Sequence, residues 1–171
     1  DDDVTSPKLN IAWHPFDNQL YYFNYATGFR PGNINNPQLT NVRVFTANGF
    51  PQDAIDRAAS YVSYESDEVE SYELGAKLTL ADGRLQIAAA LYHMKWNDMI
   101  QLSFDTQIPG VIQDFNANIG AAHSEGLELE LNWQPIDRLN LRLAGDLNEA
   151  ETDEDNPGQG GPTSGLPKGS K

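Results

Sequence analysis

Hydrophobic and polar residues alternate with a period of two along most of this chain. In one such segment Tyr72, Leu74 and Leu80 alternate with polar positions that include Glu73 and Lys77. Successive side chains of a β-strand point to opposite faces, so this period predicts strands with one apolar and one polar face. We predict six of them, at residues 8–14, 19–29, 71–81, 84–101, 117–133 and 138–148.

Short turn sequences join these strands into three hairpins. The dipeptide Asp82-Gly83 is the clearest, because a type I′ turn needs positive φ angles and favours Asp-Gly. The segments Pro15 to Asn18 and Gln134 to Asp137 carry the Pro, Asp and Asn residues that turns prefer. The sequence therefore predicts an all-β, antiparallel, up-and-down fold.

The connections at the other end of the hairpins are much longer, at residues 30–69, 103–116 and 149–171. Loops of this length inside a compact domain are usually functional or disordered. Within the first loop, Asp53 to Tyr61 has a weak helical pattern. In the strand 84–101 the apolar positions change face near Ala90, which we interpret as a β-bulge.

Composition narrows the classes of function. The chain has 171 residues, with 25 acidic against 11 basic ones and a net charge of −14. This balance argues against nucleic-acid binding, which needs Lys and Arg to replace phosphate counterions. There is no cysteine, and the three histidines lack metal-ligand spacing, so no metal site or cofactor is predicted. The acidic run Glu151 to Asp155 could hold Ca²⁺, but it lacks the EF-hand spacing and fits a solvated loop better.

A catalytic site is not indicated. Ser63, Asp67 and His93 would make a nominal triad, but no nucleophile-elbow or metal motif accompanies them. We therefore expect that the protein is not an enzyme.

Short turns at one end and long loops at the other are typical of outer-membrane barrels, whose strands are apolar toward lipid and polar toward the lumen. No stretch approaches the ~20 apolar residues of a membrane helix, but alternating strands give a far weaker hydropathy signal. A soluble sandwich would show the same period, so periodicity alone leaves both interpretations open.

Several short motifs follow one another in an order that resembles the TonB-dependent outer-membrane receptors. The segment 25–35 (YATGFRPGNIN) is similar to the point where a barrel strand of that family enters an extracellular loop. Residues 68–77 (EVESYELGAK) resemble a strand of the same family. Further similarity lies in DGRL at 82–85, WNDMIQ at 96–101, NIGAA at 118–122, GLELE at 126–130 and GLPK at 165–168.

The resemblance implies a plugged barrel of about 22 strands in the bacterial outer membrane. Six strands cannot close such a barrel, so residues 1–171 are expected to be a fragment that lacks the plug domain and the barrel closure. The expected function is TonB-dependent uptake of a scarce nutrient, above all a ferric siderophore. The expected partners are outer-membrane lipid, a small-molecule ligand such as an iron chelate, and TonB through the absent N-terminal part of the parent.

The first long loop holds the candidate ligand contacts. Its arginines suit an anionic ferric chelate, and its aromatic rings could stack on a catechol or a sugar. The alternative is that Arg30 and the asparagines only shape the turn at the strand end. The candidates are Arg30, Asn33, Asn35, Arg43, Phe45, Tyr61 and Tyr64.

A second function remains open: a soluble, acidic β-sandwich that binds a glycan on stacked aromatic rings. The positions of the aromatic residues distinguish the two. If Tyr21, Phe23, Trp96 and Trp133 form bands on lipid-facing strands, the barrel is favoured. If they line a core between two sheets, the sandwich is favoured.

Overall fold

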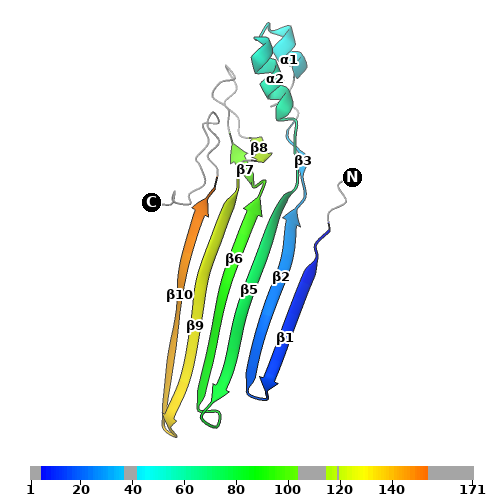
Figure 1. Ribbon diagram of the computed structural model, residues 1–171. Coiled ribbons are helices and arrows are strands. Elements are labelled where there is room, and N and C mark those ends of the chain that lie inside the picture. The colour runs from blue at the N-terminus through cyan, green and yellow to red at the C-terminus, as the bar shows by residue number, and fades with distance from the viewer. Residues whose placement is uncertain (1–4, 37–41, 104–114, 119, 154–171) are drawn as a thin grey trace.

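A computed structural model describes residues 5–36, 42–103, 115–118 and 120–153. Its main element is one antiparallel sheet, shown in Figure 1, in the order β1-β2-β5-β6-β9-β10. Each long strand pairs with the long strands that precede and follow it, so the predicted six-stranded antiparallel topology is confirmed. The strands are β1 Lys8–Phe16, β2 Gln19–Arg30, β5 Asp67–Leu80, β6 Leu85–Asn97, β9 Ala122–Ile136 and β10 Leu139–Thr152.

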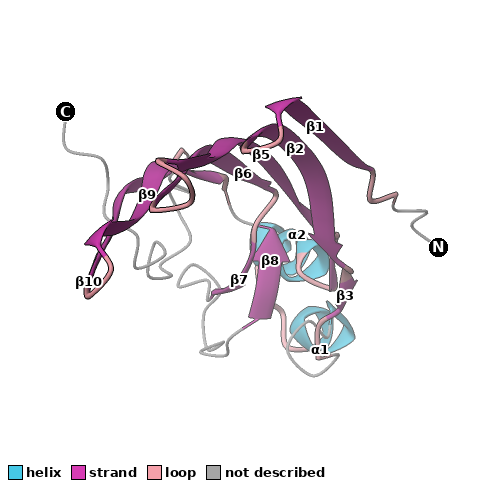
Figure 2. Ribbon diagram, turned by 90° about the horizontal axis from the view of Figure 1, so that it is seen from below, coloured by secondary structure: helices cyan, strands magenta, loops and turns pink. Residues whose placement is uncertain are grey.

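Smaller elements gather at the end of the sheet away from the short turns (Figure 1). They are α1 Val42–Ala47, α2 Gln52–Ser60, the ribbon of β3 Asn33–Ile34 with β4 Ser63–Tyr64, and the ribbon of β7 Ile100–Ser103 with β8 Phe115–Asn118. Figure 2 shows that the sheet is curved and that these elements lie over its concave side. The concave side is thus the side toward which both long loops fold.

The helix predicted at Asp53 to Tyr61 is confirmed as α2, whereas α1 is not predicted from the sequence. Pro51 precedes the first turn of α2, and Asp53 and Arg57 lie in its first and last turns, where their charges suit the helix dipole. α1 is six residues long and has no charged residue of the favourable sign at either end, so it offers no comparable signal.

Two of the three short turns are tighter than predicted, and the third is wider, since residues 81–84 and not Asp82-Gly83 alone join β5 to β6. β1 continues to Phe16 and β9 continues to Ile136, which leaves two-residue turns at Asp17-Asn18 and Asp137-Arg138. The register shifts between Trp13 and Phe16 on β1, and opposite Leu139 and Leu141 on β9. Both shifts contain a proline, because a bulge leaves one residue unpaired and a proline there loses no ladder hydrogen bond. The prolines therefore belong to bulges and not to the turns.

The predicted bounds at the loop end also need correction. β5 begins at Asp67, not at 71, and β10 runs to Thr152, so Glu149 does not open a tail. The predicted strands 84–101 and 117–133 are each interrupted, at Asp98 and at Gly120, where positive φ angles of 50° and 71° turn the chain out of the sheet into β7 and β8. The sequence alone does not distinguish β7 and β8 from continuations of β6 and β9. Their pairing with each other, seen only in the folded structure, does.

The predicted bulge near Ala90 is wrong, since β6 pairs with β5 and β9 without a register shift. The apparent change of face has a different cause. On the polar face, a Cβ atom at Gly75 would overlap the ring of Tyr22, which pairs with Gly75 across the strands. Ala90 follows Gly75 in the same register row. Small residues on this face therefore leave room for a neighbouring aromatic ring.

The register places apolar residues of all six strands in rows on one face. One row joins Ile11, Phe23, Leu74, Leu91, Leu127 and Leu147. These aliphatic side chains are largely exposed, from 38% for Leu127 to 73% for Leu147. From Tyr72 to Leu80, β5 carries this face for eight residue steps, about 27 Å at ~3.4 Å per residue. These nine residues fall within the ~9–11 that a tilted transmembrane strand needs to cross the bilayer core.

Aromatic residues lie toward both ends of this apolar face. The rings of Tyr25 and Tyr72 are 5.0 Å apart toward the loop end, and those of Trp13 and Tyr21 are 5.6 Å apart toward the short turns. Trp133, two rows closer to the short turns, is 44% exposed. Two of the four aromatic residues that distinguish the interpretations, Tyr21 and Trp133, belong to this arrangement, which is of the kind that a barrel predicts.

Two of the four diagnostic aromatic residues lie outside these bands. Phe23 occupies the middle of the apolar face, and Trp96 points to the opposite face, where its indole N–H reaches Asp67. The described long strands form a single layer, and buried hydrophobic residues cluster in the loops, around Phe45, Ile55 and Ala58. Since no second sheet of long strands packs on the first in the described residues, the sandwich alternative does not fit.

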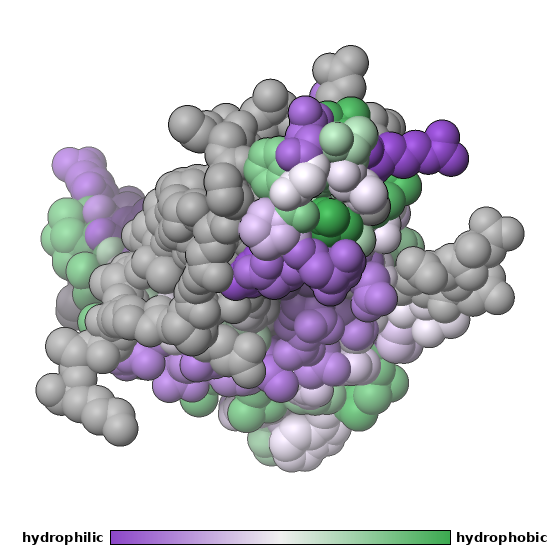
Figure 3. Space-filling view, turned by 90° about the horizontal axis from the view of Figure 1, so that it is seen from above, coloured by the Kyte–Doolittle hydropathy of each residue, from purple (hydrophilic) through white to green (hydrophobic). Residues whose placement is uncertain are grey.

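The opposite, concave face is polar. Figure 3, viewed from the loop end, shows hydrophilic side chains toward the concave side and hydrophobic ones along the outer border. Asn24 donates to Glu73 at 3.3 Å, and Arg142 forms an ion pair of 2.9 Å with Glu130. Antiparallel pairing of β9 with β10 thus sets an arginine beside a glutamate. The helices of the described residues, α1 and α2, have six and nine residues, and neither could span a membrane.

Candidate functional site

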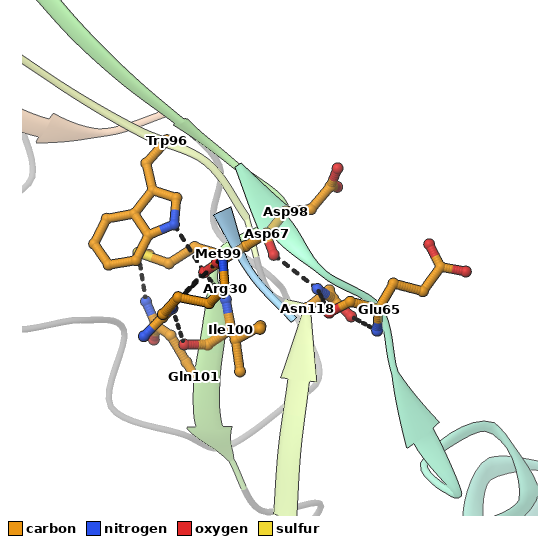
Figure 4. Close-up of polar contacts among 9 residues, drawn as sticks. All are labelled: Arg30, Glu65, Asp67, Trp96, Asp98, Met99, Ile100, Gln101 and Asn118. Carbon is orange, nitrogen blue, oxygen red and sulfur yellow. Dashed lines mark hydrogen bonds and ion pairs between the residues drawn. The ribbon is translucent and has the colours of Figure 1, made fainter. Parts of the chain in front are cut away.

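The loop end of the concave face is organised around the carboxylate of Asp67, the first residue of β5. Asp67 is only 2% exposed, although it is charged. Its oxygens accept hydrogen bonds from the indole N–H of Trp96 at 2.8 Å and from the backbone N–H of Ile100 at 3.0 Å. Arg30 donates to it through Nε at 3.0 Å, through Nη2 and through its backbone N–H at 3.2 Å. One buried carboxylate therefore joins β2, β6 and β7 (Figure 4).

The environment of Asp67 keeps it ionised. Burial of the carboxyl raises its pKa, but the hydrogen bonds from Arg30, Ile100 and Trp96 and the charge of Arg30 outweigh burial, so the net pKa is lowered. A buried carboxylate is tolerated only where hydrogen bonds and an opposite charge compensate its lost hydration. The arrangement is thus a structural ion pair, and a triad of Ser63, Asp67 and His93 does not form around it.

Arg30, one of the candidate ligand contacts, uses its side chain to bind Asp67, Trp96 and Ile100. Its guanidinium lies 4.8 Å from the centre of the Trp96 ring, and its Nη2 donates to the carbonyl of Ile100 at 2.9 Å. Half of its side chain is still exposed. The donors of Arg30 therefore hold the base of the loops, in agreement with the alternative that Arg30 shapes the strand end.

Asn35 is a second candidate that the structure places in an internal role, since it is 6% exposed. Its side-chain amide donates to the carbonyls of Tyr61 at 2.9 Å and Asn116 at 2.7 Å. Its amide oxygen accepts the backbone N–H of Asn116 at 2.8 Å. Asn35 thus ties the first long loop to β8 of the second.

Phe45 and Tyr61 also face inward. Phe45 packs with Ile55 and Ala58 in a small core between α1 and α2, against which Tyr61 lies. The Tyr61 ring stacks on Phe115 of β8, with the ring centres 4.0 Å apart. These two aromatic candidates stabilise the loops, and only part of Tyr61 is open to solvent.

The remaining candidates are more accessible. Arg43 lies on the exposed surface of α1, and Asn33 is exposed in β3, where its Oδ1 accepts the N–H of Ile34 at 2.8 Å. Tyr64 is half-buried and pairs with Asn33 across the β3–β4 ribbon. Of the seven candidates, these three are the ones whose side chains are not central to the links between the loops.

Several residues that organise this site were not among the candidates. Asn118 accepts the backbone N–H of Glu65 at 2.7 Å and donates to the carbonyls of Glu65 at 3.0 Å and Asp98 at 2.8 Å. Figure 4 shows Asn118 between these segments. A polar residue that bridges two loops through backbone groups leaves no periodic signal, so the sequence could not identify it.

In the described part of the chain, no group of three or more His, Asp or Glu side chains converges as a metal site. His93 lies 3.4 Å from Glu125 and His123 lies 2.5 Å from Asp153, and the two histidine rings stack with their centres 6.1 Å apart. The acidic run Glu151 to Asp155, considered for Ca²⁺, lies partly outside the described residues, as does the GLPK segment at 165–168.

Comparison with known proteins agrees with this architecture. Residues 1–169 match the family model described as TonB dependent receptor-like, beta-barrel. The metal-pseudopaline receptor CntO of Pseudomonas aeruginosa is 32% identical over 107 residues, which is 62% of this chain and 14% of that protein. The probable TonB-dependent siderophore receptor PiuA of Acinetobacter baumannii is 26% identical over 140 residues, 81% of this chain and 16% of that protein.

A solved structure shows the same fold. The alcaligin outer-membrane receptor FauA of Bordetella pertussis superimposes with a TM-score of 0.54 at 22% identity, over 89% of this chain and 23% of that one. The chain therefore spans less than a quarter of the length of these proteins.

Proposed function

This chain belongs to the TonB-dependent receptor-like β-barrel family of the outer membrane, and on that premise we propose that its parent imports a ferric siderophore. In this proposal residues 1–171 form one section of the barrel wall and two of its ligand-facing loops. The parent supplies the plug domain, the remaining strands and the segment that contacts TonB. Membership of a receptor family also agrees with the expectation that the chain is not an enzyme.

The observation that carries the proposal is the continuous apolar face of the six-stranded sheet. Exposed side chains such as Ile11, Leu74 and Leu143 would form an unusually large apolar patch on a soluble protein. Against lipid the same face is stable, while the polar concave face suits a water-filled lumen. In this orientation the short turns are periplasmic and the long loops extracellular.

The ligand class rests on two supports. Relatives with the same barrel segment are described as receptors for metal-pseudopaline and for a siderophore. The exposed loop surface also carries a cation, Arg43, and a half-buried phenol, Tyr64, which suit an anionic chelate with aromatic or hydroxylated groups. We propose that Asn33, Arg43 and Tyr64 contact the ligand, while Arg30, Asn35, Phe45 and Tyr61 support the loops that present them.

Uptake by the intact parent receptor tests this function. A strain without the parent gene is grown under iron limitation with ferric catecholate, ferric hydroxamate and ferric carboxylate chelates, each as the sole iron source. We expect growth on at least one of them to be lost and to return with the intact gene only when TonB is present. Undiminished growth on all three would contradict import of a ferric chelate.

The ligand contacts have their own test on the chelate so identified. Arg43→Ala should weaken its binding about tenfold, which is the order of a lost charge-assisted hydrogen bond. Arg84→Ala removes the same charge at the short-turn end, where Arg84 is 3.1 Å from Asp137, and should leave binding unchanged. Equal affinities of the two variants for the chelate would show that Arg43 does not contact it.

A further inference from the structure

Two long loops, far apart in sequence, are joined at their base by Asp67. The first loop connects β2 to β5, and the second connects β6 to β9. Asp67, at the point where the first loop enters β5, accepts hydrogen bonds from Trp96 near the end of β6 and from Ile100 at the start of the second loop. Arg30, at the start of the first loop, donates to both Asp67 and the carbonyl of Ile100. Neither loop can move at its base without breaking bonds to the other.

A second connection lies farther from the sheet. Asn118, in the second loop, forms one hydrogen bond with the N–H of Glu65 and one with its carbonyl, at 2.7 Å and 3.0 Å. Its third bond, to the carbonyl of Asp98, closes the second loop on itself. A single amide therefore satisfies backbone groups of both loops.

The third connection lies nearest the helices. Asn35 of the first loop exchanges two hydrogen bonds with the backbone of Asn116, and Tyr61 stacks on Phe115 at 4.0 Å. Because Tyr61 also packs against the small core of Phe45, Ile55 and Ala58, this contact fixes the two helices to β8. The helices are thus connected to the sheet by contacts with the second loop as well as by the chain of the first loop.

Separation of the loops would be costly, since the linking groups are buried. Asp67 and Asn35 are 2% and 6% exposed, so opening would leave a carboxylate and an amide without their partners until water reached them. Links of this kind at three levels resist both sliding and hinging of one loop against the other, and the β3–β4 and β7–β8 ribbons stiffen each loop internally.

We propose that the described parts of these two loops form a single rigid body, and that Asp67 is the positioning residue that sets its orientation on the barrel wall. A ligand that contacts the helical tip would then displace β7 and β8 as well, although they belong to another loop. The ligand part of this statement rests on the proposed function; the mechanical coupling does not.

Hydrogen–deuterium exchange of the full-length receptor in detergent micelles, without ligand, tests the coupling. Asp67→Asn keeps the shape of the side chain but removes its charge. We expect amide exchange to become about tenfold faster or more at residues 33–35 and 63–65 and also at 100–103 and 115–118, because a lost bond to a buried charge costs enough to raise local opening to that extent. Glu68→Gln, next along β5 with an exposed side chain on the other face, removes the same charge and should change neither loop.

Asn35→Ala serves as the second variant, since it leaves the base of the loops intact. It should accelerate exchange at 115–118 and 100–103 in the second loop, where no residue is changed. Faster exchange confined to the first loop, in either variant, would overturn the proposal, as would unchanged exchange in both. If Asp67→Asn fails to fold, Asn35→Ala alone decides the outcome. Because no ligand is present, a negative result would leave the uptake experiments unaffected.

Discussion

At the scale of the residue, glycines facing a neighbouring tyrosine are a recurrent feature of the concave face. Gly75 lies under Tyr22, and Gly126 lies under Tyr92, each pair being formed across adjacent strands. The Tyr92 hydroxyl also accepts a hydrogen bond from Asn148 of β10. These glycines are required for the space they leave, so each tyrosine can lie across the strand beside it.

Replacement of Gly126 should therefore be destabilising. A Cβ atom there would lie 2.6 Å from the carbonyl oxygen of Leu147 and 2.7 Å from Cζ of Tyr92. For Gly126→Ala we expect a loss of about 1–3 kcal/mol in the free energy of unfolding, measured by urea titration of the full-length receptor in micelles. Gly28→Ala is the matched control, because nothing lies within 4 Å of that position. A Gly28→Ala variant as unstable as Gly126→Ala would contradict the explanation that the lack of space for a Cβ atom causes the loss of stability.

Asp67 makes the stability of the loops depend on pH. Its pKa is lowered in the folded protein, so it stabilises the loops above its ordinary pKa, and this contribution is lost as the pH falls toward the lowered value. We expect exchange at residues 100–103 to accelerate below pH about 4, after correction for intrinsic rates. Asp67→Asn should lose this dependence, and an acid response retained in that variant would assign it to another group.

At the scale of the element, the two faces of each long strand are expected to meet different surroundings, with lipid on the apolar face and water on the concave face. Leu129 of β9 lies on the apolar face, one row from the Phe23–Leu127 row at its middle, whereas Ala144 of β10 is on the concave face opposite Glu130. The same substitution on the two faces should therefore have different effects, which is a direct test of which face meets lipid.

Lysine is the useful substitution for this test. Leu129→Lys should lower the free energy of unfolding in lipid vesicles by about 2–4 kcal/mol, the usual cost of a lysine near the bilayer midplane. Ala144→Lys places the charge toward the lumen beside Glu130 and should cost little. Folding is followed by the mobility of heated and unheated samples on gels. Equal costs on the two faces would contradict the assignment of the apolar face to lipid.

At the scale of the whole molecule, the described sheet has two open edges, β1 and β10, each with one neighbouring strand. In lipid every backbone polar group needs a partner, and in water an open edge beside an apolar face promotes association. The section therefore depends on the rest of a barrel for its stability, which agrees with the short part of its relatives that it covers.

Residues 1–171 expressed alone should consequently not form a monodisperse monomer in detergent-free buffer. We expect large aggregates by light scattering, and a shift toward smaller particles when detergent covers the apolar face. The full-length receptor in the same detergent is the control. A folded monomer in plain buffer would mean that the apolar face is buried by some other packing of this chain.

The sequence by itself determined the six strands, their order and their two faces, because a period of two and turn residues such as Asp82-Gly83 act locally. It also carried the family resemblance that residues 1–169 confirm. The sequence predicted the ends of the strands less well. The prolines at 15 and 135 lie in bulges, and only the pairing with a neighbouring strand reveals a bulge.

What only the tertiary structure decided lies at the loop end. The pairing of Asp67 with Arg30, Trp96 and Ile100 joins residues up to 70 positions apart, and no local pattern encodes such contacts. For the same reason Arg30 and Asn35 looked like ligand contacts in the sequence, where a polar loop residue has the same appearance whether it faces solvent or a buried partner. Burial is a property of the assembled fold, and it separates the candidates that hold the loops from those that remain exposed.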